Sequence, residues 1–230
     1  MATSGSTSFN LSIDEVIEEA YERCGVQTNS GYDLRSARRK LNILFSEWGN
    51  RGLNLWKVEL NQVALVTGQA NYSVDAAASD VLEAYISSSS GTPTTSTNDI
   101  ALSKIDRSAY SALPNKGSQG QPSQYYVDRQ RTPVIYLYQT PDLNTYTHLK
   151  YYTINRIEDA GSYTNDPDVV YRFLPCMCSG LAFYLAHVKA PDRVPILKQL
   201  YEDELMRALD EDGARSSVYI SPQTYFGDGV

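Results

Sequence analysis

The spacing of apolar residues in this 230-residue chain changes twice along its length. At both ends they recur every three or four positions, which places them on one face of a helix. In the middle they recur every second position, as along a strand with one buried face. Helices at the two ends have only each other as evident partners. We therefore expect an α+β fold: a helical bundle built from N- and C-terminal helices, with an inserted antiparallel β domain and an extended C-terminal tail.

The same pattern divides the chain into four parts. We assign residues 1–54 to the N-terminal helices of the bundle, 55–160 to the inserted β domain, 161–213 to the C-terminal helices of the bundle and 214–230 to the extended tail. Apolar residues make up 42% of the chain and charged residues 20%. This composition favours packed cores over a disordered chain.

Two recognisable signals bound the first helix. Ser12 and Glu15 match the S-x-x-E capping box, in which side chains satisfy free backbone N–H groups at a helix start. Gly25 suits the left-handed residue that often follows a helix. The residues expected on the buried face are Ile13, Val16, Ile17, Ala20 and Tyr21, and those on the acidic face are Asp14, Glu15, Glu18 and Glu22.

The second helix has the opposite charge. Its apolar stripe runs from Leu34 to Trp48, and the helix ends at Gly49 or Gly52. An antiparallel pairing of the two charged faces would be electrostatically favourable. The alternative is that both faces are solvated, since exposed ion pairs contribute only about 0–1 kcal/mol. The basic residues of this helix are Arg35, Arg38, Arg39 and Lys40.

The middle of the chain predicts short strands separated by Gly, Pro, Ser and Thr. We expect a hairpin around residues 131–133, and a short helix from Ser103 to Leu113 with Ser103 as its cap and Pro114 as its stop. Residues 87–97 and 115–123 predict loops, the first of them mobile. The expected strands are residues 56–66, 72–74, 80–87, 99–102, 124–129, 134–139 and 147–153.

Helical periodicity returns at Asp166, where Asp-Pro supplies a cap and a first-turn proline. We expect an apolar helix from there to Val188, which Pro175 bends or shifts to a later start. A last helix follows Pro191 or Pro195 and ends at Gly213. Its expected inward residues are Leu197, Leu200, Tyr201, Leu205 and Leu209, and its outward residues are Glu202, Asp203, Asp210, Glu211 and Asp212.

The sequence predicts no catalytic, cofactor or metal site, and we expect no enzyme. Its only histidines, His148 and His187, lie in no nucleophile motif. Cys176 and Cys178 would point about 200° apart on a helix, so we interpret them as packing residues. No P-loop or G-x-G-x-x-G motif is present. The acidic clusters 202–204 and 210–212 are interpreted as a solvated helix face.

Charge and cysteine content indicate the environment of the protein. The net charge of -7 argues against a chain that grips nucleic acid along its length. Three cysteines cannot all pair within one chain, and the first residues lack the pattern of a secretory signal. No apolar run reaches the roughly 20 residues of a membrane span. We expect a soluble protein, made in a reducing cytosol, that does not enter a membrane.

Tyrosine is over-represented, with 18 residues against 5 Phe and 2 Trp. A tyrosine ring has an apolar body and a polar tip, which suits a surface that is buried only after assembly. One face of the β region would then be core and the other an interface; the alternative is the ordinary strand propensity of tyrosine. The residues concerned are Tyr125, Tyr126, Tyr136, Tyr138, Tyr151 and Tyr152.

Several segments carry a family resemblance. These are SIDEVIEEAYERCGV and RSARRKLNILFSEWGNRGLNLW near the N-terminus, PVIYLYQTPD and LKYYT in the middle, and VVYRFLPCMCSGLAFYLAHV near the C-terminus. Over about residues 10–213, the chain resembles the head-to-tail adaptor (connector) proteins of short-tailed bacteriophages, in particular the tail tubular protein A-like family.

The resemblance implies a structural role in the virion. It implies a homo-oligomeric ring, usually dodecameric, that lies beneath the portal protein and receives tail nozzle and tail fibre proteins. DNA would pass through the channel without sequence-specific binding, and the negative subunits would let it slide. The protein would be made in the host cytoplasm and located at the head–tail junction. The tail would contact the portal through Val218, Tyr219, Ile220, Tyr225 and Phe226.

Other functions stay open from the sequence. One is a different virion head-completion or tail-connecting protein. Another is a hydrolase that uses paired Asp and Glu residues or His187, which would require a pocket with converging carboxylates. A carbohydrate-binding module would require exposed aromatic platforms on one sheet face.

Overall fold

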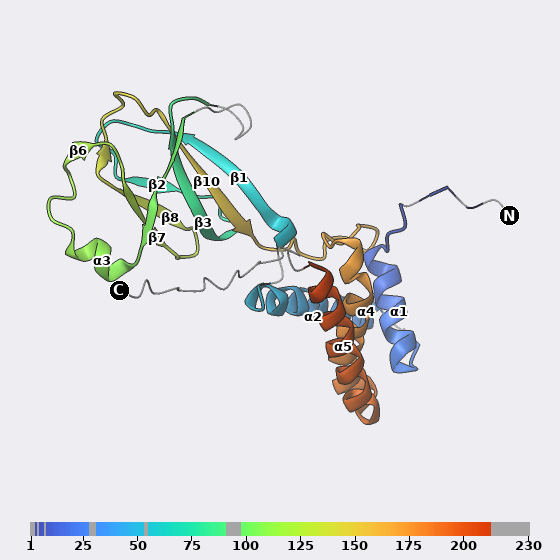
Figure 1. Cartoon of the computed structure of the whole chain (residues 1–230). Coiled ribbons are helices and arrows are strands. Elements are labelled where there is room, and N and C mark those ends of the chain that lie inside the picture. The colour runs from blue at the N-terminus through green and yellow to red at the C-terminus, as the bar shows by residue number, and fades with distance from the viewer. Residues whose placement is uncertain are drawn as a thin grey trace, which may run out of the picture.

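A helical body and a β region lie at two ends of the molecule in the computed structural model (Figure 1). The structure describes residues 3, 5–6, 8–27, 31–52, 55–90 and 98–212. The predicted α+β class with an inserted antiparallel β region is confirmed. The predicted tail, residues 214–230, and most of the predicted Ser/Thr loop, residues 91–97, lie outside the described residues. No helix in the described part of the chain is both long and apolar enough to span a membrane.

The helical body is built from both ends of the chain. Its long helices are α1 (Ile13–Cys24), α2 (Gly31–Asn50), α4 (Leu174–Lys189) and α5 (Val194–Asp212). They bury one continuous hydrophobic core whose members come from residues 13–48 and 157–208. Its largest fully buried side chains include Tyr21, Trp48, Phe173 and Tyr201. The expectation that terminal helices would pack on each other is thus met.

The first helix follows its predicted signals. The capping box is formed, with the Ser12 backbone N–H donating to the Glu15 carboxylate at 2.8 Å. Gly25 has a φ of 69° and closes the helix as a left-handed cap. All five residues predicted on the apolar face are buried. Local sequence signals therefore fix both ends of α1.

The third long helix begins later than its periodicity predicts. The helix predicted from Asp166 starts at Leu174, after the 3-10 turn η2 (Tyr171–Phe173). Pro175 lies in the first turn of α4, where its missing N–H costs no hydrogen bond. Of the two effects predicted for this proline, the shifted start is therefore the one that occurs. Cys176 and Cys178 are both buried, as predicted.

The β region packs two sheets around a second hydrophobic core. The first sheet has the antiparallel order β1 (Val58–Ala64), β10 (His148–Asn155), β3 (Ala78–Ser87) and β4 (Asp99–Ala101). The second has the order β2 (Asn71–Ser73), β8 (Val134–Tyr138), β7 (Gln124–Asp128) and β5 (Ser103–Ile105), with β5 parallel to β7. β6 (Gln119–Gly120) pairs separately with β9 (Thr140–Pro141).

The register of the strands explains how this core is filled. Leu149 of β10 faces Ile86 of β3 across the first sheet, and Tyr125 of β7 faces Leu137 of β8 across the second. All four side chains are buried. The hydrophobic faces of the two sheets meet, so the apolar residues that recur every second position form a core between two layers. The predicted hairpin around residues 131–133 is the β7–β8 connection.

The short helix of the β region was predicted too long. Ser103 does not cap it; Ser103–Ile105 is strand β5. The helix, α3 (Arg107–Ala112), begins after Asp106, whose carboxylate accepts the Ala109 N–H at 2.6 Å. Aspartate caps a helix as well as serine does, so the local sequence allowed both starts. The parallel pairing with β7 decides between them.

The β region is tied to the helical body where the chain enters and leaves it. Trp56, in the 3-10 turn η1 (Leu55–Lys57), packs its ring 5.0 Å from that of Phe173. Its indole N–H donates to the Asp168 carbonyl, and the Lys57 ammonium lies 2.8 Å from the Asp168 carboxylate. The two connections thus meet at one junction. A further 3-10 turn, η3 (Pro191–Arg193), joins α4 to α5.

Candidate functional site

The cysteines and histidines considered from the sequence have structural surroundings in the described chain. Burial raises the pKa of the Cys176 thiol to about 12 and that of Cys178 to about 11, so neither is a thiolate at neutral pH. The His187 ring packs 4.9 Å from Phe183, and His148 Nδ1 lies 2.8 Å from the Thr147 hydroxyl. Within the described ranges, no three His, Cys, Asp or Glu residues are placed to hold a metal ion.

A groove of about 610 Å³ lies beside α1 and is closed on its other side by η2 and the start of α4. Leu11, Leu174, Pro175 and Cys178 contribute apolar lining. Phe9 and Tyr171, which also line it, are 66% and 73% exposed. Exposed aromatic rings beside an apolar floor are typical of a surface that a partner covers. We call this hollow the α1 groove.

The wall that α1 contributes to this groove is acidic. Glu15, Glu18, Glu19 and Glu22 all line it. Glu15 belongs to the capping box, and Glu19 pairs with Arg23 at 2.7 Å. Glu18 and Glu22 form no ion pair within the described part of the chain. The carboxylates of the groove are therefore either committed to α1 itself or free to meet a cation from outside.

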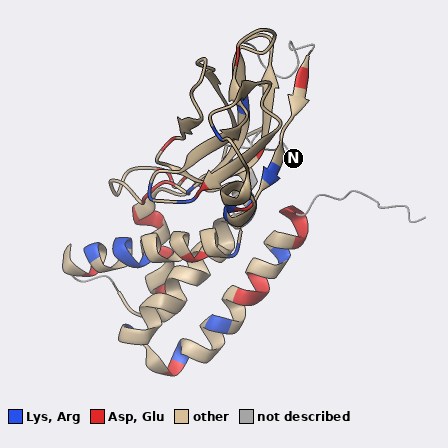
Figure 2. Cartoon of the chain, turned by 90° about the vertical axis from the view of Figure 1, so that its left-hand side faces the viewer, with Lys and Arg blue, Asp and Glu red and all other residues tan. Residues whose placement is uncertain are grey.

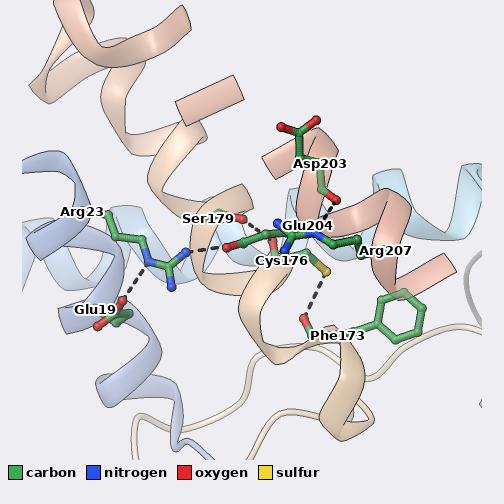
Figure 3. Close-up of polar contacts among 8 residues, drawn as sticks. All are labelled: Glu19, Arg23, Phe173, Cys176, Ser179, Asp203, Glu204 and Arg207. Atoms are coloured by element: carbon green, nitrogen blue, oxygen red, sulfur yellow. Dashed lines mark hydrogen bonds and ion pairs between the residues drawn. The ribbon is translucent and has the colours of Figure 1, made fainter. Parts of the chain in front are cut away.

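Polar contacts beside this wall tie α1 to α5 (Figure 3). Arg23 points away from α1, between Glu19 at 2.7 Å and Glu204 of α5 at 3.5 Å. Burial opposes its charge, but the contacts with the two carboxylates outweigh it and raise the pKa of Arg23. On α4, the Cys176 thiol donates to the Phe173 carbonyl at 3.2 Å. These contacts fix the groove on a rigid packing of three helices.

The exposed face of α2 carries a stripe of a different kind. Tyr32, Arg35, Arg39 and Ile43 follow one another at spacings of three and four, so they share one face of the helix. Tyr32 is 67% exposed and Ile43 49%. With Ser36, the first three line a shallow hollow of about 300 Å³. We call Tyr32, Arg35, Arg39 and Ile43 the α2 stripe.

Figure 2 shows Lys and Arg residues gathered toward one end of α2. Two of them contact segments outside α2: Arg38 donates to the Gly161 carbonyl at 3.1 Å, and Lys40 donates to the Tyr184 carbonyl at 2.6 Å. Arg35 reaches only the Gly31 carbonyl of its own helix, at 3.3 Å. Arg35 and Arg39 form no ion pair with a described residue, which leaves their charge facing outward.

Of the two alternatives for the charged faces of α1 and α2, the described residues do not form the electrostatic pairing. Arg23 of α1 pairs within its helix and with α5, and Arg51, which follows α2, pairs with Glu47 and Glu202. The two helices instead bury their apolar faces against each other and against α4, so their charged faces point away from the shared core. This agrees with the predicted alternative of two solvated faces.

The tyrosines of the β region divide as predicted between core and surface. Tyr125 and Tyr151 are buried, at 1% and 6% exposure. On the other face, Tyr126 and Tyr136 are half-buried with ring centroids 6.0 Å apart, and Tyr110 of α3 stacks on Tyr126 at 5.6 Å. These rings pack on one another rather than form a flat platform. That the surface face is an interface stays a prediction.

The portal contact predicted at Val218, Tyr219, Ile220, Tyr225 and Phe226 lies outside the described residues, so it stays a prediction. Sequence reasoning missed the α1 groove, because its lining comes from segments more than a hundred residues apart. The α2 stripe left a signal: Tyr32 and Ile43 are apolar residues that fall off the predicted buried face. Such residues at helical spacing can indicate a second, partner-facing surface.

Comparison with known families gives a match. The family model described as SU10 adaptor protein matches residues 31–224, a range that contains α2, the β region, α4 and α5 but not α1. No curated protein matches the chain. The match agrees with the predicted resemblance to phage head-to-tail adaptors. The tail tubular protein A-like subgroup stays a prediction.

Proposed function

Because this chain belongs to the SU10 adaptor protein family, and is thus a structural phage adaptor of the virion's head–tail junction, we propose that it acts there as a ring. Such rings are usually dodecameric in the adaptor family that the chain resembles. The ring would lie between the portal protein and the tail nozzle and fibres of a short-tailed phage. DNA would pass through its channel without sequence-specific binding. The observation that carries the proposal is the family match over most of the chain.

The arrangement of the chain supports a connecting role. The helical body presents charged and aromatic surfaces on α1 and α2, while the β region lies at the other end of the molecule (Figure 1). An adaptor has to hold neighbours in its own ring as well as unlike proteins above and below it. Separate bodies, each with its own core, allow one to serve the ring while the other reaches a different partner. The limits of 55–160 for the β body stay a proposal; at its C-terminal end, Ile157 and Ala160 already pack in the helical core.

The net charge supports passage of DNA rather than its retention. A subunit of net charge -7, repeated around a channel, gives a field that repels phosphates. A protein that gripped DNA would need clustered Lys and Arg facing the channel. Reversal of channel-facing acidic residues should therefore slow DNA ejection, and unchanged ejection rates would contradict this part of the proposal.

The direct test is binding to the portal. The purified chain is mixed with portal rings of the same phage, and the mass of the product is measured by native mass spectrometry. We expect a discrete complex with many copies of the chain per portal ring. A chain that stays free at every concentration would contradict the proposal. Electron microscopy of particles separates a ring from another head-completion or tail-connecting protein.

The tail has its own test. We propose that Val218, Tyr219, Ile220, Tyr225 and Phe226 contact the portal, since a few apolar residues on a short segment bury themselves best against a partner. A chain truncated after Gly213 keeps all of α5 and should fold, yet bind portal rings more weakly. A second variant keeps the full length of the chain and replaces the five residues with serine. Unchanged affinity of both variants would reject this role.

A further inference from the structure

We propose that the α1 groove of one copy receives the α2 stripe of a second copy of this chain, and that this contact joins neighbours around the ring. The inference rests on the proposed function, because it assumes that copies of the chain assemble. It deepens that function by naming the two faces that meet. It also assigns a binding role to both charged faces of the helical body.

The first face combines free negative charge with open apolar surface. Glu18 and Glu22 lie one helical turn apart on the groove wall, and neither is used in an ion pair of the described chain. Beside them, Phe9 and Tyr171 are more than half exposed over the floor formed by Leu174 and its neighbours. A single chain gains nothing by exposing such rings. A partner that is apolar and basic would cover them and neutralise the wall.

The second face has the complementary chemistry. The α2 stripe alternates apolar bodies with positive charge: Tyr32 and Ile43 lie at its ends, and Arg35 and Arg39 lie between them. The two guanidinium groups are also one turn apart, so their spacing along α2 matches that of the two free carboxylates along α1. Arginine pairs well with carboxylates at interfaces because its planar group donates several hydrogen bonds at once.

The two faces cannot meet within one copy. Each lies opposite the buried side of its own helix, and those buried sides meet in the shared core. α1 and α2 touch near the start of α2, where the Tyr21 hydroxyl donates to the Asp33 carbonyl at 3.3 Å, but this contact lies on their buried sides. Unlike faces on opposite sides of a subunit form a head-to-tail contact. Such a contact repeats from copy to copy and closes into a ring when the rotation allows.

Charge reversal tests the contact. One variant carries Glu18→Lys and Glu22→Lys, and a second carries Arg35→Glu and Arg39→Glu. Alone, each variant brings like charges together at every contact, so its association constant should fall at least about a hundredfold. An equimolar mixture, or one chain with all four changes, restores opposite charges and should regain assembly. Assembly is measured by native mass spectrometry and analytical ultracentrifugation, alone and on portal rings.

Matched controls separate the contact from net charge and folding. Asp203→Lys with Asp210→Lys makes the same charge change on exposed positions of α5, and Arg107→Glu with Arg131→Glu makes the opposite one in the β region. Both controls should assemble like the natural chain. Circular dichroism checks that every variant keeps its helices. All substituted positions are partly or fully exposed, so the folds should persist.

Each outcome decides the proposal. The proposal is supported if each reversed variant alone loses assembly and the mixture of the two regains it. Normal assembly of the natural chain and of both reversed variants overturns the interface while the proposed adaptor ring stands. Loss without recovery in either rescue also overturns it, because the two faces would then act on different partners. A natural chain that stays monomeric even with portal rings overturns the proposed function and this interface together.

Discussion

The helical core and the β core are assembled from very different stretches of chain. Helical core residues come from positions 13–48 and 157–208, whereas β core residues all lie between positions 65 and 151. The helical body therefore forms only when both ends of the chain meet, while the β region can bury its core from one continuous segment. Closing the long loop costs entropy that strong contacts must offset.

Those contacts include a polar chain that links the N-terminal and C-terminal helices. The Trp48 indole N–H donates to the Tyr201 hydroxyl at 3.0 Å, and that hydroxyl donates to the Glu47 carboxylate at 3.0 Å. Arg51 contacts Glu47 and also Glu202 of α5. The β region has polar contacts of its own, such as the buried Lys150 ammonium of β10, which lies 3.4 Å from the Asp99 carboxylate of β4. We infer that polar contacts fix the pairing of distant helices, while strand register together with such contacts fixes the β region.

The two cores can be followed separately. Both tryptophans, Trp48 and Trp56, belong to or pack against the helical core, as do all three cysteines. Tryptophan fluorescence therefore reports on the helical body. Hydrogen exchange of the β10 amides reports on the β region. The predictions below use these two signals.

The largest effect is expected from Phe173→Ala. Phe173 is fully buried between the rings of Trp48 and Trp56, at 5.8 and 5.0 Å. Its truncation should lower the free energy of unfolding of the helical body by about 3–5 kcal/mol. Denaturant unfolding followed by tryptophan fluorescence measures this. The matched variant Leu137→Ala should shift the β10 exchange signal instead; a common shift of both signals would show one cooperative unit.

Alkaline pH should weaken the helical body before the β region. The buried thiols have a folded pKa raised from 9.0 to about 12 for Cys176 and about 11 for Cys178. The unfolded chain therefore releases these protons first. Stability is complete below pH 9 and falls as pH rises toward 11–12.

At pH 10 the two thiols together should lower the free energy of unfolding of the helical body by on the order of 3 kcal/mol. The β core holds no cysteine, and its buried Tyr125 has a pKa raised from 10.0 to about 12. The β region should therefore begin to lose stability one pH unit higher than the helical body. Unfolding midpoints at pH 8, 9 and 10 by both signals measure the difference. A double Cys176→Ala and Cys178→Ala chain should lose most of this pH dependence. Parallel decline of both regions in that window would contradict the comparison.

A smaller effect is expected from Gly180→Ala in α4. A Cβ atom there would lie 2.9 Å from the Tyr201 ring and 3.0 Å from a Leu44 methyl group. The helices would have to separate, at a cost of about 1–3 kcal/mol, although alanine favours helix. The control Gly49→Ala on α2, where the added atom meets nothing within 4 Å, should not destabilise the fold. Thermal unfolding by tryptophan fluorescence compares the two.

The smallest effect is expected from Tyr201→Phe. It removes the hydroxyl that joins Trp48 to Glu47 and leaves the indole N–H without its acceptor, which should cost about 1–2 kcal/mol. The fluorescence maximum of the protein should also shift as the Trp48 environment changes. An unaltered unfolding free energy would show that the polar link does not hold the two chain halves together.

The comparison also separates what the sequence could predict from what it could not. Periodicity and capping signals located the long helices and most strands, because Ser12, Glu15 and Gly25 act within a few residues of their own position. Errors arose where distant contacts decide. Ser103, for example, joins a strand rather than capping a helix because β7 lies beside it.

The candidate surfaces follow the same division. The acidic and basic faces were evident from Glu18, Glu22, Arg35 and Arg39, but the sequence left open whether they pair within one chain or are both solvated. Only the packing of α4 against both α1 and α2 shows that these faces point apart. The groove needed two distant segments, residues 9–23 and residues 171–178, and periodicity does not bring such segments together.

A reconstruction of the head–tail junction by electron cryomicroscopy, at a resolution that separates helices, tests the central claim most directly. We expect a closed ring of this chain between portal and tail, with the helical bodies side by side and α1 of each copy against α2 of the next. Absence of the chain from the junction, or a ring whose copies touch only through their β regions, would contradict the account.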